Sequence, residues 1–117
     1  MNLLTKADLI FLSTLNIGGL RALLYEKSYN EAMRIRRNMQ VAMAMYRGDI
    51  PSITQDKYLR VINRISSWCA DVFFRVEISR YLRQTRLVEK MSLKDAMEYA
   101  KARLKPIWAD YERRNSF

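Results

Sequence analysis

The chain has 117 residues, enough for one domain with a modest core, and its 50% hydrophobic and 28% charged residues argue against a disordered protein. Three glycines and two prolines are too few for an all-β fold, so we expect an all-α fold, a compact bundle of four to five helices around one long central helix, with residues 1–117 as a single domain. There is no histidine, and the lone Cys69 excludes an intrachain disulfide and the usual zinc sites within one chain.

Positive charge is the strongest functional signal. The chain has 21 lysines and arginines against 12 acidic residues, a net charge of +9, and arginine predominates among the basic residues. Such an excess indicates an acidic partner (nucleic acid, an acidic protein surface or anionic lipid) more readily than it indicates a reaction. The arginine bias favours planar, bidentate recognition of phosphate or carboxylate.

The N-terminal segment contains a helix start followed by an apolar stretch. Thr5 can cap a helix whose first turn contains Asp8. The apolar face expected for this helix consists of Ala7, Ile10, Phe11 and Leu15. Gly18 and Gly19 are expected to end it with positive φ angles, and a short second helix is expected to run from Leu20 to about Glu26.

The uncharged stretch from Leu9 to Leu20 resembles a membrane or targeting segment only superficially. It is too short to span a bilayer as a helix, and it lacks the basic leader and the cleavage site of a signal peptide. We therefore expect no membrane partner. Since a lone cysteine fits a reducing compartment, we also expect a cytoplasmic location.

Ser28 and Glu31 have capping-box spacing and open a helix predicted from about Tyr29 to Arg47. Its expected core face consists of Ala32, Ile35, Met39, Ala42, Met43 and Tyr46. The opposite, basic side consists of Arg36, Arg37, Gln40 and Arg47, with Arg34 on the flank. From Met39 to Tyr46 the helix is apolar nearly all round, which indicates deep burial or a second contact surface. The methionines Met39, Met43 and Met45 suit an adaptable interface, although core filling is their commoner role.

The stretch from Tyr58 to Glu89 reads as one long helix, and the capping-box spacing of Ser52 and Gln55 allows it to begin as early as Ile53. Its first half has an apolar stripe formed by Tyr58, Val61, Ile62, Ile65, Trp68, Cys69, Val72, Phe73 and Val76. After Glu77 the apolar stripe changes direction and is formed by Phe74, Ile78, Tyr81, Leu82, Thr85 and Val88. Two intramolecular neighbours explain this pattern most simply; a break near Glu77, or an interface with another molecule, are the alternatives.

A final helix begins at Ser92 and Asp95, which again have N-cap spacing. The apolar period continues to Tyr111, but Pro106 lies within it. Because proline removes a backbone hydrogen bond and clashes with the preceding turn, we expect a kink or break near residues 103–105. Residues 113–117 are expected to form a frayed tail.

No motif names a reaction. The chain has no glycine-rich loop of the kind that cradles phosphate, and the one carboxylate pair at helical spacing, Asp95 and Glu98, lies beside Lys94 and Lys101 on a face that we expect to be solvated. We therefore predict a protein that is not an enzyme, with no catalytic residue, no metal site and no cofactor.

Two basic clusters are the candidate binding sites. The first consists of Arg34, Arg36, Arg37 and Arg47, and the second of Arg75, Arg80, Arg83, Arg86 and Lys90. Arg80, Arg83 and Arg86 follow one another at a spacing of three, so on a helix they would form a ladder along one side. Solvated faces partly paired with Glu77 and Glu89 are the alternative interpretation of both clusters.

The preferred hypothesis is a small basic accessory protein that binds nucleic acid, or associates with nucleoprotein, through backbone phosphates. The alternative is a helical adaptor or inhibitor that docks on an acidic protein surface, with the segment from Met39 to Tyr46 as its apolar centre. A homo-oligomer is compatible with either hypothesis. Its interface would use the second stripe of the long helix, namely Phe74, Ile78, Tyr81 and Leu82.

Overall fold

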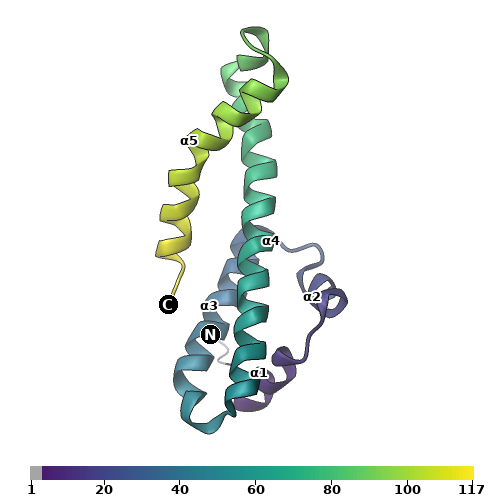
Figure 1. Ribbon diagram of the computed structural model, residues 1–117, viewed down its shortest axis with the longest axis vertical. Coiled ribbons are helices and arrows are strands. Elements are labelled where there is room, and N and C mark those ends of the chain that lie inside the picture. Colours follow the sequence, from purple (N-terminus) through teal and green to yellow (C-terminus); the bar gives the residue numbers. More distant parts are fainter. Residues whose placement is uncertain (1–3) are drawn as a thin grey trace. The chain divides into compact units, whose positions relative to one another are not determined.

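The computed structural model describes residues 4–117, which form α-helices, short 3-10 turns and no strand (Figure 1). The elements are α1 (Lys6–Ser13), α2 (Ile17–Leu24), α3 (Tyr29–Tyr46), η1 (Arg47–Asp49), α4 (Ser52–Thr85), η2 (Leu87–Glu89) and α5 (Leu93–Arg114). The predicted all-α fold with one long helix is confirmed.

The chain divides into two compact units. Unit 1 comprises the chain up to Cys69 together with Asn115–Phe117, and unit 2 comprises Ala70–Arg114. The first part of α4 contacts α1 and α3, and its second part contacts α5. Each apolar stripe of the long helix therefore has an intramolecular neighbour, and α4 continues through Glu77 without the break that was the alternative.

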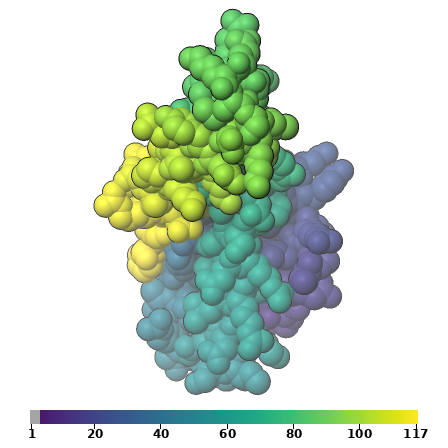
Figure 2. Space-filling model, turned by 45° about the horizontal axis from the view of Figure 1, so that its top comes forward, coloured from purple at the N-terminus to yellow at the C-terminus, as the bar shows by residue number. Residues whose placement is uncertain are grey.

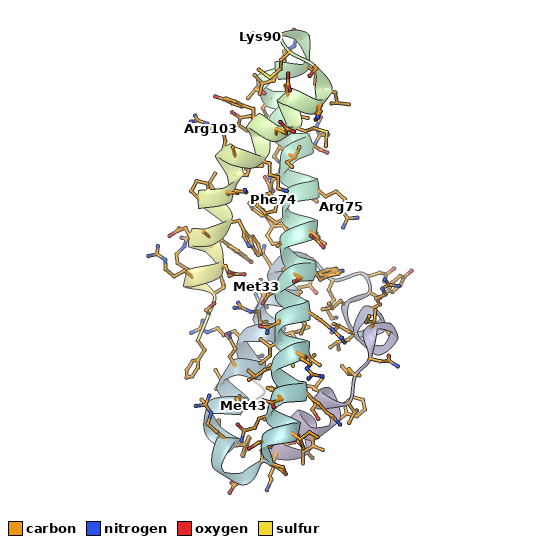
Figure 3. All side chains as sticks on the ribbon, viewed as in Figure 1. Met33, Met43, Phe74, Arg75, Lys90 and Arg103 are labelled. Atoms are coloured by element: carbon orange, nitrogen blue, oxygen red, sulfur yellow. The ribbon has the colours of Figure 1, made fainter. Side chains whose placement is uncertain are left out.

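In unit 1, α3 and the first part of α4 run antiparallel (Figure 1). The Tyr58 hydroxyl donates to the Met39 carbonyl at 2.7 Å, and the Cys69 thiol lies 3.8 Å from the Tyr29 carbonyl. The side chains buried in this unit are mostly apolar: Leu9, Leu20, Leu24, Ala32, Met33, Met39, Ala42, Met43, Ile50, Tyr58, Val61, Ile62, Ile65 and Cys69. Figure 3 labels Met33 and Met43 among them. Cys69 is therefore a small buried hydrophobe, as its place in the stripe predicts.

The prediction of which face of α1 is buried is wrong. Leu9 and Ser13 are the buried residues of this helix, whereas Ile10 and Phe11 are 44% and 64% exposed. Burial of Ser13 is tolerated because its hydroxyl donates to the Ile10 carbonyl at 2.6 Å, so no polar atom loses its partner.

The two consecutive glycines do not form the expected turn. Gly18 and Gly19 lie inside α2, and neither has a positive φ. Instead, Asn16 caps α2 by accepting a hydrogen bond from the Gly19 amide at 2.8 Å. The residues with positive φ are Glu26 and Arg86, at 60° and 56°.

At the N-terminus of α1, Thr5 and Asp8 form the predicted cap in both directions. The Asp8 carboxylate accepts from the Thr5 amide at 2.8 Å, and Thr5 Oγ1 accepts from the Asp8 amide at 3.1 Å. The Thr5 amide, followed by the Thr5 hydroxyl, holds the pKa of Asp8 below its ordinary value.

We expect Asp8→Asn to lower the melting temperature at neutral pH and to have progressively less effect in acid. A depressed pKa means that the ionised carboxylate stabilises the folded state above the ordinary pKa of 3.8, and that this contribution disappears as the pH falls through the lowered value. Thermal melts of both proteins across this pH range check the prediction. An unchanged difference in melting temperature at every pH would contradict it.

The long helix α4 begins and ends differently from the prediction. Gln55 does not complete a capping box with Ser52; its side-chain amide donates to the carbonyls of Arg47 and Ile50, each at 2.8 Å, and so holds the preceding loop. At the other end the helix stops at Thr85 instead of Glu89, because Arg86 adopts a left-handed conformation. The Arg86 amide still donates to the Leu82 carbonyl at 2.9 Å, as in a helix-ending turn.

In unit 2, α5 returns alongside the second part of α4. The buried residues of α5 are spaced four apart: Ala96, Ala100, Leu104 and Trp108. The Trp108 ring packs against the Phe73 ring, with ring centroids 5.0 Å apart, and the ring centroids of Tyr81 and Tyr99 are 6.4 Å apart. The turn around η2 is the green end of this hairpin in Figure 2.

α5 begins as predicted but does not break at its proline. The Ser92 hydroxyl accepts from the Asp95 amide at 3.2 Å. The helix then continues through Pro106 to Arg114, although it changes direction part-way along its length (Figure 1). Pro106 itself is exposed, and burial of Leu104 and Trp108 on either side of it holds the two halves of the helix in place.

Candidate nucleic-acid interface

The surface of α3 and of the η1 turn that follows it, in unit 1, carries three of the four arginines in the first predicted cluster. Its buried stripe consists of Ala32, Met33, Arg36, Met39, Ala42 and Met43. Arg34, Arg37 and Arg47 are exposed. Arg37 lies on α3 together with Gln40, and Arg47 follows the C-terminal end of the same helix as the first residue of η1.

Arg36 does not belong to this surface, so the prediction that it lies on the exposed basic side is wrong. Its side chain is 8% exposed. Compared with the predicted core face, the buried stripe of α3 is shifted around the helix so that it includes Arg36 and Met33. The residues expected in that place, Ile35 and Tyr46, are only half-buried. A long arginine side chain can enter a core because its methylene stem packs as an apolar group.

Within the described part of the chain, the exposed Arg34, Arg37 and Arg47 form no ion pair. The four ion pairs found within residues 4–117 all lie in unit 2: Arg80–Glu77, Arg86–Glu89, Arg113–Asp110 and Arg114–Asp110. Since Arg34, Arg37 and Arg47 have no carboxylate within salt-bridge distance in the described chain, their charge is available to an external anion.

The second predicted cluster is only partly available. Arg80 pairs with Glu77 at 3.2 Å, and Arg86 pairs with Glu89 at 3.0 Å. Because Arg86 lies beyond the end of α4, the predicted ladder does not extend to it. Arg83 remains on the helix and is exposed.

Two further members of the second cluster are also exposed, Arg75 on α4 and Lys90 beyond η2. Figure 3 shows the Arg75 side chain pointing away from α5, whereas Lys90 lies at the turn of the hairpin. The structure therefore does not gather this cluster on one face of a single helix.

The residues predicted to form an apolar interface have mixed positions. Met39 and Met43 are buried in the core of unit 1, so they do not form an exposed apolar surface there, while Met45 is 53% exposed. The second-stripe residues are all half-buried: Phe74, Ile78, Tyr81 and Leu82. They are covered in part by α5, which is the neighbour that this stripe requires.

Both units contain a hollow. In unit 1 a hollow of about 440 Å³ is lined by Gln40, Met43, Ala44, Arg47, Leu59, Ile62, Asn63 and Phe117. In unit 2 a hollow of about 520 Å³ is lined by Phe74, Ile78, Leu93, Lys94, Met97, Glu98 and Lys101. The first adjoins the arginine surface of α3, and the second is an apolar groove with lysines at its rim.

Sequence reasoning missed two contributors to the positive surface of unit 1. Arg60 and Arg64 are exposed on the first part of α4, four residues apart and therefore on one side of the helix. Their position opposite the apolar stripe was the signal that could have placed them among the candidate residues.

Within residues 4–117, no helix combines the length and the apolar character needed to cross a bilayer. No family model, curated protein or solved structure matches the chain.

Proposed function

We propose that the protein binds nucleic acid through backbone phosphates, and that Arg34 and Arg37 on α3 and Arg47 at the start of η1 are the principal contacts. The observation that supports this most strongly is the distribution of ion pairs. Acidic neighbours pair with several arginines of unit 2, whereas these three arginines are exposed without a carboxylate partner within the described chain. Unpaired guanidinium groups displace the counterions of a phosphate backbone at a smaller penalty, because no internal ion pair has to be broken.

The mode of binding follows from the residue types on this surface. Each guanidinium group can donate two parallel hydrogen bonds to one phosphate. The side-chain amide of Gln40, on the same side of α3, adds a neutral hydrogen-bond donor. Phosphate contacts fix position and carry no sequence information. We therefore infer binding that discriminates little between sequences.

The test is the affinity of the full chain for fluorescent single-stranded and double-stranded oligonucleotides, measured by anisotropy at several salt concentrations. We expect a dissociation constant of about 1 μM or lower at low salt, and an affinity that falls by about 0.9 log units per phosphate contact for each tenfold rise in salt on duplex DNA. Absence of binding at low salt, or an affinity that salt does not change, would contradict the proposal.

A second candidate function rests on the groove of unit 2. Leu93 and Met97, at its edge, are 61% and 45% exposed, and Lys94 and Lys101 lie beside them. An amphipathic helix with an acidic rim matches this combination of apolar groove and basic edge, as a helical adaptor would require. Binding of such a partner helix should persist in the triple variant Arg34→Gln/Arg37→Gln/Arg47→Gln and should be abolished by Met97→Glu. Pull-down of the helical partner with each of the two variants therefore separates the two candidate functions.

A further inference from the structure

Arg36 is a buried cation for which the structure provides no counter-charge. Its side chain is 8% exposed, and no carboxylate of residues 4–117 lies within salt-bridge distance of it. Its Nε atom is buried without an acceptor in this part of the chain. A buried guanidinium is unfavourable unless an anion and hydrogen-bond acceptors satisfy it, so the environment of Arg36 lacks a negative group.

The hydroxyl of Ser116 reaches this guanidinium group. Arg36 Nη2 donates to Ser116 Oγ at 3.1 Å, and Arg36 Nη1 lies 3.9 Å from the weakly accepting sulfur of Met33. A phosphate group on that hydroxyl would bring three strong acceptors and a charge of about −1.5 to −2 to the guanidinium.

The residues around Ser116 form a charge pattern that a modifying enzyme can read. Arg113 and Arg114 precede Ser116 by three and two positions, and the apolar Phe117 follows it. This is the substrate pattern that basophilic serine/threonine kinases select through acidic subsites. The side chains of Arg113 and Arg114 are 78% and 68% exposed.

The segment can reach a kinase by a small opening. Asn115–Phe117 lies beyond the end of α5, and Phe117 is 67% exposed. Its link to α3 consists in part of the Arg36 contact and of the Phe117 amide donating to Gln40 Oε1 at 3.0 Å. A short segment beyond the end of a helix can open locally without global unfolding.

We propose that Ser116 is phosphorylated by a basophilic serine/threonine kinase and that Arg36 then holds the phosphate. Ser116 Oγ attacks the γ-phosphorus of ATP, the new Oγ–P bond forms as the bond to the β–γ bridging oxygen breaks, ADP leaves, and the hydroxyl proton passes to the base of the kinase. The contacts between Arg36 and Ser116 that support this proposal do not depend on nucleic-acid binding.

The first test incubates the full chain with ATP and the catalytic subunit of cAMP-dependent protein kinase, and locates phosphate by mass spectrometry. We expect one phosphate on Ser116 and none at that position in Ser116→Ala. Arg113→Gln/Arg114→Gln should react at least about tenfold more slowly because the kinase loses its charge contacts. No phosphate on Ser116 of the full chain, while a peptide of residues 110–117 is phosphorylated, would overturn the proposal.

The second test concerns the role of Arg36. Phosphorylation should raise the melting temperature by about 5 °C in the wild-type chain and should not raise it in Arg36→Met, which retains the apolar volume. A phosphatase should also remove phosphate from the folded chain at least about tenfold more slowly than from the phosphopeptide of residues 110–117, a comparison that needs no variant. An equal rise in both proteins, or equal rates of dephosphorylation, would overturn the assignment of Arg36 as the receptor.

Discussion

Replacing Arg34, Arg37 and Arg47 with glutamine should weaken binding to a duplex oligonucleotide at least about tenfold at moderate salt, a change of about 1.4 kcal/mol. The salt dependence should become shallower by about 0.9 for each phosphate contact that is lost. Glutamine keeps much of the length and polarity of arginine and removes its charge. Since all three side chains are exposed, the fold should be retained.

The matched control removes the same number of charges from arginines that already have acidic partners. Arg80, Arg86 and Arg113 each form an ion pair in unit 2. Their replacement by glutamine changes the net charge as much as the replacement of Arg34, Arg37 and Arg47 does. It should therefore weaken the long-range attraction to nucleic acid to the same extent but leave the contacts of those three arginines in place. Equal loss of affinity in both triple variants would show that net charge alone, and not the surface of α3, determines binding.

Tyr58→Ala should lower the free energy of unfolding by about 3–5 kcal/mol, more than any other substitution proposed for this protein. A typical domain is stabilised by about 5–15 kcal/mol, so this loss is a large part of the total. Tyr58 is 0% exposed, and its hydroxyl donates to Met39 O at 2.7 Å between α3 and α4. Burial also raises the pKa of this hydroxyl above its ordinary value, because the phenolate would lose its hydration.

Tyr58→Phe separates the ring from the hydroxyl. It keeps the packing and removes one hydrogen bond, and the Met39 carbonyl still accepts the backbone amide one turn on in α3, so we expect a loss of only about 0.5–1.5 kcal/mol. Urea denaturation of the two variants checks both values. If the phenylalanine variant lost as much stability as the alanine variant, the hydroxyl rather than the packing of the ring would hold α3 to α4.

Helix starts could be predicted from the sequence because they depend on neighbouring residues. Thr5, Ser28 and Ser92 all accept a backbone amide three residues later, as the cap spacing predicts. The change of stripe along α4 likewise predicted two neighbours, because a straight helix cannot bury two differently directed faces against one partner.

Features that depend on distant residues could not be predicted in this way. Phe11 is exposed and Arg36 is buried. The elements that pack against a helix decide which of its faces is buried, and the periodicity of apolar residues alone does not determine that face. The break that was one expectation at Pro106 does not occur, because packing on either side of the proline outweighs its local preference.

The candidate site was predictable only in its composition. Arg37 and Arg47 were predicted to be exposed from their position opposite the apolar residues of this helix, and Arg34 from its place on the flank, but the same pattern wrongly placed the buried Arg36 with them. Whether an acidic neighbour pairs with them depends on side-chain geometry and on where helices end. Arg86, for example, left the predicted ladder because α4 ends at Thr85.

The most direct measurement is an NMR titration of the isotopically labelled chain with a duplex oligonucleotide, which follows the side-chain Nε–Hε signals of the arginines. The phosphate-binding account predicts large shifts for Arg34, Arg37 and Arg47, and small ones for the ion-paired Arg80 and Arg113. Large shifts confined to the arginines of unit 2, with those of α3 unchanged, would contradict it.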